Sequence, residues 1–168
     1  MTRTRLKSKL NLLTLFNGEF WFLDEKMHIA DKVIHQDENK AKEMERSNTV
    51  NSQDFFNFLD KTAIDAVVNC AGFTGKPNVD ECEVRKEECF IQNSILPRDI
   101  EEVCKLKRVN LIHVSSGCIY TGYDKDYTEE DEPNFGMFDS DSSFYSKSKH
   151  AGELNLDTNF TNIIRIRI

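Results

Sequence analysis

Two side chains near the carboxyl end of the sequence could move a proton at neutral pH. Tyr145 and Lys149 are four residues apart in the segment SFYSKSK (143–149), and on a helix this spacing puts both on one face. An ammonium group near a phenol stabilises the phenolate and lowers the tyrosine pKa from about 10. Tyrosine can then donate or accept a proton. The alternative is a solvent-exposed helix face with no chemical role.

A second candidate group follows an apolar run. Ser115-Ser116-Gly117-Cys118 comes directly after VNLIHV (109–114), and ligands of open α/β sheets bind beyond the carboxyl ends of the strands. The Ser116 hydroxyl could therefore bond a substrate carbonyl oxygen. From these residues alone, the favoured alternative is a strand-ending turn in which Gly117 takes a special backbone angle.

Two further groups could line a cofactor site. Asn69-Cys70-Ala71-Gly72 follows the β-branched run IDAVVN (64–69), and its small residues would let a flat cofactor approach the backbone. An ordinary turn is the alternative. Asn93 lies inside a predicted helix, where asparagine is mildly unfavourable. It therefore has a task there, or it lies near a helix end.

The elements that must position these residues alternate along the chain. Short apolar runs predict three strands, at 64–69, 109–115 and 162–168. Amphipathic spacing predicts four helices, from Ser52 through Leu59, at 79–94, at 97–107 with Pro97 at its start, and at 144–156. This alternation predicts an α/β fold with a doubly wound parallel sheet. The acidic, turn-rich stretch 123–136 is expected to be a surface loop.

Composition excludes several classes of function. The 168 residues include 22 Lys and Arg against 29 Asp and Glu, a net charge of −7, which disfavours nucleic acid and anionic membrane surfaces as partners. No apolar stretch reaches the about 20 residues of a membrane span. The basic, then apolar start is interrupted by Asn11 and Thr14, and no small-residue cleavage site follows, so we expect no signal peptide.

The cysteines indicate a reducing compartment. Their number is odd and no C-x-x-C pair occurs, so a secreted disulfide framework and a zinc site are both disfavoured. We expect free thiols, no metal and a cytoplasmic location. The five are Cys70, Cys82, Cys89, Cys104 and Cys118.

The order and spacing of the four candidate groups resemble the extended short-chain dehydrogenase/reductase superfamily. The chain is more closely similar to dTDP-4-dehydrorhamnose reductase-like proteins, above all to the bifunctional nucleotide-sugar 3,5-epimerase/4-reductases of rhamnose synthesis. The resemblance covers about residues 62–168. The segments that carry it are VVNCAGFTGKPNVDECE (67–83), SSGCIY (115–120), EEDEPNF (129–135) and SFYSKSK (143–149).

The resemblance implies a Rossmann-like domain that binds NADP or NAD and reduces a 4-keto-6-deoxy nucleotide sugar. Tyr145 would protonate the carbonyl oxygen, Lys149 would lower the tyrosine pKa and bind the nicotinamide ribose, and Ser116 would bond the substrate oxygen. Cys118 stands where the bifunctional branch places an epimerase acid/base, although a merely packed thiol is an equal alternative. The residues that would line the cofactor site are Asn69, Cys70, Ala71, Gly72 and Asn93, together with Tyr145 and Lys149.

Two features depart from that family. Residues 1–71 contain a single glycine, Gly18, so the glycine-rich phosphate loop is missing. The segment NLLTLFNGEFWFLDEK (11–26) is interpreted as a substituted remnant of the first strand and loop. The chain also ends within a predicted strand, whereas family members continue into a substrate-binding portion. We therefore expect one Rossmann-like domain, residues 1–168, incomplete at both ends, with a degenerate part (1–60) and a recognisable reductase core (61–168).

A different class of function stays open. The regulatory subunit of methionine adenosyltransferase also resembles these reductases, so the chain could be a non-catalytic interaction protein within a homo- or hetero-oligomer. A truncated relic of an enzyme is a third interpretation. The sequence does not choose between NAD and NADP, and it does not name the sugar.

Overall fold

The computed structural model describes residues 12–16, 19–23, 29–32, 52–61, 63–122, 126–128 and 130–166. The basic start of the chain, residues 1–11, lies outside these ranges, as do residues 123–125 and 129 of the expected surface loop. Within the described part of that loop no helix or strand forms, as predicted.

Six strands form one sheet in the order β3-β2-β1-β4-β5-β6. Strands β1, β4, β5 and β6 are parallel to one another, and β2 and β3 are antiparallel to their neighbours. The α/β fold and the parallel sheet predicted from the sequence are confirmed. The strands are β1 (Leu12–Phe16), β2 (Glu19–Leu23), β3 (Ile29–Lys32), β4 (Ala66–Asn69), β5 (Asn110–Ser116) and β6 (Thr161–Ile166).

The strand β1 is followed by an antiparallel strand and not by a helix. Phe16 pairs with Glu19, so two residues separate the paired strand ends. Those residues are Asn17 and Gly18, the dipeptide that two-residue hairpins favour. In the βαβ unit of a dinucleotide-binding fold, this position opens the helix that receives the pyrophosphate. The expected loss of the phosphate loop thus coincides with a changed strand direction.

The helices agree with the sequence prediction except in how they are divided. The expected helix 79–94 is interrupted at Arg85, and its second half continues through a π-helical turn into the next helix. Pro97 lies in the first turn of α5, directly after the π turn, so the continuous helix lacks one intrahelical hydrogen bond at this residue. The helical segments are α2 (Ser52–Lys61), α3 (Glu81–Val84), α4 (Lys86–Phe90), the π turn (Ile91–Ile95), α5 (Leu96–Lys107) and α6 (Phe144–Leu154).

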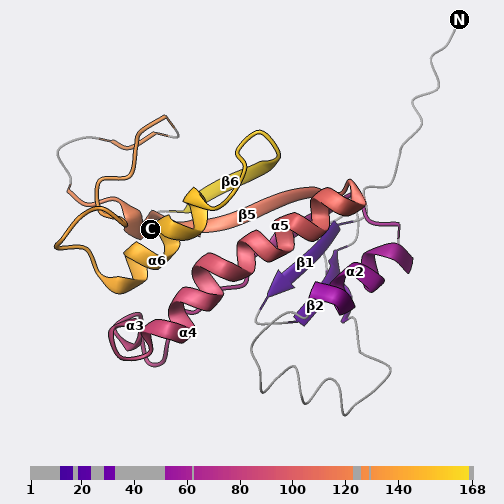
Figure 1. Ribbon diagram of the computed structural model, residues 1–168, viewed down its shortest axis with the longest axis horizontal. Coiled ribbons are helices and arrows are strands. Elements are labelled where there is room, and N and C mark those ends of the chain that lie inside the picture. Colours follow the sequence, from indigo (N-terminus) through magenta and orange to yellow (C-terminus); the bar gives the residue numbers. More distant parts are fainter. Residues whose placement is uncertain are drawn as a thin grey trace, which may run out of the picture.

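The main core lies between the sheet and α2 with α5. Figure 1 shows α4 and α5 crossing the front of the strands, with α6 on one flank and α2 on the other. None of the described helices is both long and apolar enough to cross a bilayer. The buried side chains of this core are Phe55, Leu59, Ile64, Val67, Ala71, Leu96, Ile100, Val103, Cys104, Val109 and Leu111.

The two faces of the sheet differ in their cover. Along β5, Leu111, His113 and Ser115 are buried, whereas the alternating Ile112 and Val114 are only partly buried. Successive side chains of a strand point to opposite faces. The described helices therefore pack on the face of the sheet to which Leu111 and His113 point. The candidate site lies on this same face.

Replacement of a core leucine tests this assignment of faces. Leu111 is fully buried between β4 and α5, so Leu111→Ala should lower the free energy of unfolding by about 2–5 kcal/mol, because it leaves a cavity. Leu106 on α5 is 72% exposed, and Leu106→Ala should change it by no more than about 0.5 kcal/mol. Urea unfolding measures both variants. Equal losses in the two variants would contradict the assignment.

Candidate active site

The loop after β4 is held by an asparagine at the end of the strand. The Asn69 side chain accepts a hydrogen bond from the Ala71 backbone N–H at 3.0 Å. Its amide nitrogen lies 3.1 Å from Nδ1 of His113 on the neighbouring strand β5. Both side chains are fully buried. Asn69 therefore holds the loop 70–72 through its bond to Ala71. Through its contact with His113, it also joins the carboxyl ends of β4 and β5.

Asn93 fixes the same loop from the opposite side. Its Oδ1 accepts from the Phe73 N–H at 2.8 Å, and its Nδ2 donates to the Phe73 carbonyl at 3.0 Å. The same Nδ2 lies 3.0 Å from the hydroxyl of Ser148 and 3.3 Å from the sulfur of Cys89. Asn93 lies in the π turn, a feature that often marks functional sites. The expected helix interior position is confirmed, and the task of Asn93 is to join this loop to α4 and α6.

The start of α6 is fixed by three hydrogen bonds. Ser143 caps the helix by accepting from the Ser146 N–H at 3.1 Å, and Glu83 of α3 accepts from the Phe144 N–H at 2.6 Å. The Ser146 hydroxyl donates to the Cys118 carbonyl at 2.7 Å. Because first-turn N–H groups lack partners within a helix, these contacts determine where α6 begins beside α3 and β5.

A glycine lets α6 approach the π turn closely. A Cβ atom on Gly152 would overlap with the backbone oxygen of Asn93, so no larger residue fits at this contact without a shift. One turn earlier, the Ser94 hydroxyl donates to the Ser148 carbonyl at 2.7 Å. This close approach brings the face of α6 that carries Tyr145 and Lys149 against the loop after β4.

The structure brings Ser116, Tyr145 and Lys149 together at the carboxyl end of β5. The Ser116 hydroxyl is close enough to the Tyr145 phenol to lower the pKa of that phenol, and the Lys149 ammonium nitrogen lies 6.0 Å from the centre of the Tyr145 ring. Tyr145 is 7% and Lys149 6% exposed. The alternative of a solvent-exposed helix face is therefore wrong for this pair.

Gly72 completes the cluster. A Cβ atom on Gly72 would lie 2.6 Å from the Lys149 nitrogen and 2.8 Å from Oδ1 of Asn93. Both distances are shorter than any stable non-bonded contact to a methyl carbon. The space that a side chain would take at position 72 is thus occupied by the amine of Lys149, which places this amine against the backbone of the loop.

Burial determines the protonation states of this cluster. It raises the pKa of the Tyr145 phenol, and the bond to Ser116 opposes this shift. This direction is opposite to the expected lowering by Lys149, because removal from water disfavours the charged phenolate. Burial also lowers the pKa of the Lys149 ammonium. Tyr145 therefore carries its proton at neutral pH, as a proton donor must.

The remaining candidate residues surround this centre in different ways. Cys118 is exposed in a short turn, and its N–H donates to Ser116 Oγ at 3.2 Å. Cys70 is partly buried, and burial raises the pKa of its thiol while Lys149 opposes that shift. Asn69 and Asn93 are fully buried, and their side chains bond to the loop after β4, so their lining of a cofactor site stays a prediction.

Sequence reasoning missed three buried polar residues of the site. Ser148 and Cys89 complete the hydrogen bonds of Asn93, and His113 pairs with Asn69. A signal for His113 existed, since it shares the inward period of Leu111 in the predicted strand 109–115. Neither Ser148 nor Cys89 carries such a signal, because their burial depends on how α4 and α6 pack.

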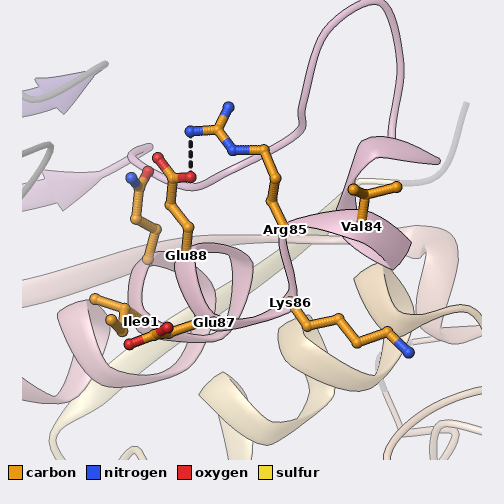
Figure 2. Close-up of a pocket in the computed structure, with 7 residues that line it drawn as sticks. Val84, Arg85, Lys86, Glu87, Glu88 and Ile91 are labelled. Carbon is orange, nitrogen blue, oxygen red and sulfur yellow. Dashed lines mark ion pairs between the residues drawn. The ribbon is translucent and has the colours of Figure 1, made fainter.

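A surface groove of about 440 Å³ lies apart from these residues, along the outer side of α3 and α4. Figure 2 shows Arg85 paired with Glu88 there, and none of its lining residues is buried. Within the described ranges, no three His, Cys, Asp or Glu side chains lie close enough together to hold a metal ion. The candidate site is therefore the cluster around Tyr145.

A family model described as RmlD substrate binding domain matches residues 27–168 of the chain. The bifunctional dTDP-4-dehydrorhamnose 3,5-epimerase/dTDP-4-dehydrorhamnose reductase of Arabidopsis thaliana is 37% identical over 110 residues. That match covers 61% of this chain and 34% of the relative. The chain thus spans about a third of the length of this curated relative.

Two solved reductases share the fold. A hypothetical dTDP-4-dehydrorhamnose reductase from Sulfolobus tokodaii matches with a TM-score of 0.56 and 28% identity, over 68% of this chain and 39% of that one. The dTDP-4-dehydrorhamnose reductase from Bacillus anthracis, solved in complex with NADP, matches with a TM-score of 0.52 over the same shares. Its identity is 20%, so it supports the fold alone.

His113 should make the stability of the chain depend on pH. Asn69 Nδ2 donates to its Nδ1, so the ring is held neutral, and burial lowers its pKa to about 3 from an ordinary value of 6.5. The unfolded chain therefore binds one more proton between these values. Stability should be complete above about pH 6.5 and should fall by about 1.4 kcal/mol per pH unit below it.

Urea unfolding between pH 4 and 8 measures this slope in the wild-type chain and in His113→Gln, whose amide is neutral throughout. Below pH 6.5, the free energy of unfolding of the variant should fall less steeply with decreasing pH than that of the wild type, by about 1.4 kcal/mol per pH unit. Above pH 7 the two slopes should be equal. The same slope in both chains below pH 6.5 would show that His113 does not titrate as its surroundings require.

Proposed function

Since the chain belongs to the RmlD substrate-binding domain family, we propose that it forms part of an NAD(P)H-dependent reductase. Its substrate would be a 4-keto-6-deoxy nucleotide sugar of dTDP- or UDP-rhamnose synthesis, and the name of the Arabidopsis relative favours dTDP-4-dehydrorhamnose. The observation that carries the proposal is the meeting of Ser116, Tyr145 and Lys149 at the carboxyl end of β5. The whole enzyme's activity is part of the proposal, because the chain spans 34% of that relative.

The residues present fit the nicotinamide end of the cofactor. Position 72 has no side chain, and the Lys149 amine lies against its backbone, so an amine donor stands at the loop that would line the cofactor. An ammonium group there can donate to ribose hydroxyls. The pyrophosphate end lacks its usual support, because the antiparallel strand β2 follows β1. The fit does not distinguish NADP from NAD.

Reduction of a ketone requires a hydride at carbon and a proton at oxygen. The reduced nicotinamide, when bound, supplies the hydride. Tyr145 holds its proton at neutral pH and would donate it to the carbonyl oxygen. The Ser116 hydroxyl is close enough to the Tyr145 phenol to lower its pKa, and it would bond the same carbonyl oxygen. The Lys149 ammonium would stabilise the phenolate that remains after proton transfer.

Cys118 supports a second activity at the same site. Its thiol is exposed two residues after Ser116, and the Cys118 carbonyl accepts from the hydroxyl of Ser146, the neighbour of Tyr145 on α6, at 2.7 Å. A thiolate in that place could remove a proton next to the ketone, which is the chemistry of an epimerase. The bifunctional name of the Arabidopsis relative favours this addition to the reductase.

Calorimetric titration of the purified chain with NADPH tests the proposal. We expect micromolar binding that weakens at least about tenfold in Lys149→Met, since a charged hydrogen bond to the ribose contributes about 1.5–3 kcal/mol. Lys147→Met on the same helix is the matched control, because its amine bonds to the Ser140 carbonyl on the surface. It should leave the affinity unchanged.

Absence of heat from a chain shown to be folded would contradict the proposal for this chain. Equal weakening by the two lysine variants would contradict the role of Lys149. In the first case a non-catalytic interaction protein would become the better interpretation.

A further inference from the structure

Helix α6 carries a third buried group in line with the two catalytic candidates. Tyr145, Lys149 and Glu153 are spaced by four residues, so they lie on one face on successive turns. Glu153 is 5% exposed. Glutamate is almost never buried to this extent unless it is paired, and the chemistry described so far gives this carboxylate no role.

The carboxylate is held from the neighbouring strand by one of its oxygens. Arg165 on β6 donates to Oε2 of Glu153 from Nε at 2.9 Å and from a terminal nitrogen at 2.8 Å. Arg165 pairs in register with Ser115 of β5. Since it alternates with Ile164 and Ile166, it projects to the helix-covered face. Strand β6 thereby fixes the position of the carboxylate under α6.

The other oxygen is not used by this ion pair. Within the described residues, Glu153 Oε1 is buried without a hydrogen-bond partner, and the same holds for Ser115 Oγ and His113 Nε2. Leaving a buried polar atom unpaired costs about 1–3 kcal/mol. A carboxylate that served only to bind Arg165 would be expected to use both oxygens in a two-pronged pair. The free oxygen therefore indicates a second electrostatic task.

The surroundings of Lys149 show what that task is. Among the described residues, burial lowers the pKa of its ammonium, and the charge effects that oppose this come, in decreasing order, from Cys89, Glu153, Cys82 and Cys70. Burial raises the pKa of the Cys70 and Cys82 thiols, so both are neutral at pH 7. An ordinary thiol is protonated at pH 7 because its pKa is about 8.5, and Glu153 is the one carboxylate among these four groups. It is therefore the group that brings negative charge near the amine.

The other titratable neighbours add no negative charge. Burial keeps Tyr145 protonated and His113 neutral at pH 7, and Arg165 adds a positive charge on the far side of Glu153. The groups that face Lys149 from the elements around it are Cys70, Cys82, Cys89, His113, Tyr145, Glu153 and, behind Glu153, Arg165.

We propose that Glu153 is a positioning residue for Lys149. Anchored by Arg165, its carboxylate keeps the buried amine charged and in place beside Tyr145 and Gly72. The purpose of this arrangement rests on the proposed reductase function, whereas the charge effect of Glu153 on Lys149 belongs to the chain without cofactor. Glu153 touches no reacting atom and acts only through Lys149.

Lysine NMR titration tests the inference without any cofactor. The chain is labelled with carbon-13 lysine, and the Lys149 signal is assigned by its loss in Lys149→Met. In Glu153→Gln, the titration midpoint of Lys149 should fall by about one pH unit, the effect of removing one nearby opposite charge. Glu153→Asp keeps the charge and should restore most of that shift.

Two controls separate this effect from damage to the fold. Glu102→Gln removes a carboxylate that is exposed on α5, and it should leave Lys149 unchanged. Unfolding would move the midpoint up toward the ordinary lysine value of about 10.4, opposite to the expected shift. A midpoint that stays fixed or rises in Glu153→Gln would overturn the inference.

The outcomes of this titration and of the NADPH titration are independent. If Lys149 responds to Glu153 but the wild-type chain binds no NADPH, the inference stands and the proposed function fails. If NADPH binds and the titration midpoint of Lys149 is the same in Glu153→Gln as in the wild type, the proposed function stands and the inference fails.

Discussion

The hydrogen bonds between the side-chain amide of Asn93 and the backbone of Phe73 are the constraint on which the site depends. The Asn93 side chain accepts from the Phe73 N–H and donates to the Phe73 carbonyl. It thus pairs both backbone groups of Phe73, as a neighbouring strand would. The same amide reaches Ser148 of α6. Because backbone groups removed from water must be paired, the loop after β4 and the helix that carries Tyr145 are held in one relation.

Burial acts in the same sense on the acid and the base of this site. It raises the pKa of Tyr145 and lowers the pKa of Lys149, so it favours the neutral form of each. A neutral phenol suits a proton donor, whereas a neutral amine would neither stabilise a phenolate nor bind ribose as a cation. The site therefore needs a negative charge near Lys149 and none near Tyr145. The position of Glu153, two turns beyond Tyr145 on α6, meets both needs.

Much of the fold could be predicted because its core strands are local apolar runs. The predicted strands 64–69, 109–115 and 162–168 overlap with β4 (Ala66–Asn69), β5 (Asn110–Ser116) and β6 (Thr161–Ile166), and the Tyr145–Lys149 spacing falls on α6. The hairpin of β1 and β2 was missed, although Asn17-Gly18 is a turn signal, because the segment was interpreted as a remnant of another motif. The π turn and the pairing of Glu153 with Arg165 depend on packing between distant segments. No local spacing encodes them.

The account's central claim is that Tyr145 gives the proton in a reduction that uses NADPH. The most direct measurement is the NADPH-dependent reduction of dTDP-4-dehydrorhamnose by the chain and by Tyr145→Phe, with the NADPH affinity of both. The account predicts turnover at least about 100-fold lower in the variant, the usual contribution of a general acid, at unchanged affinity. Equal turnover in the two, or none by a folded wild-type chain, would contradict it.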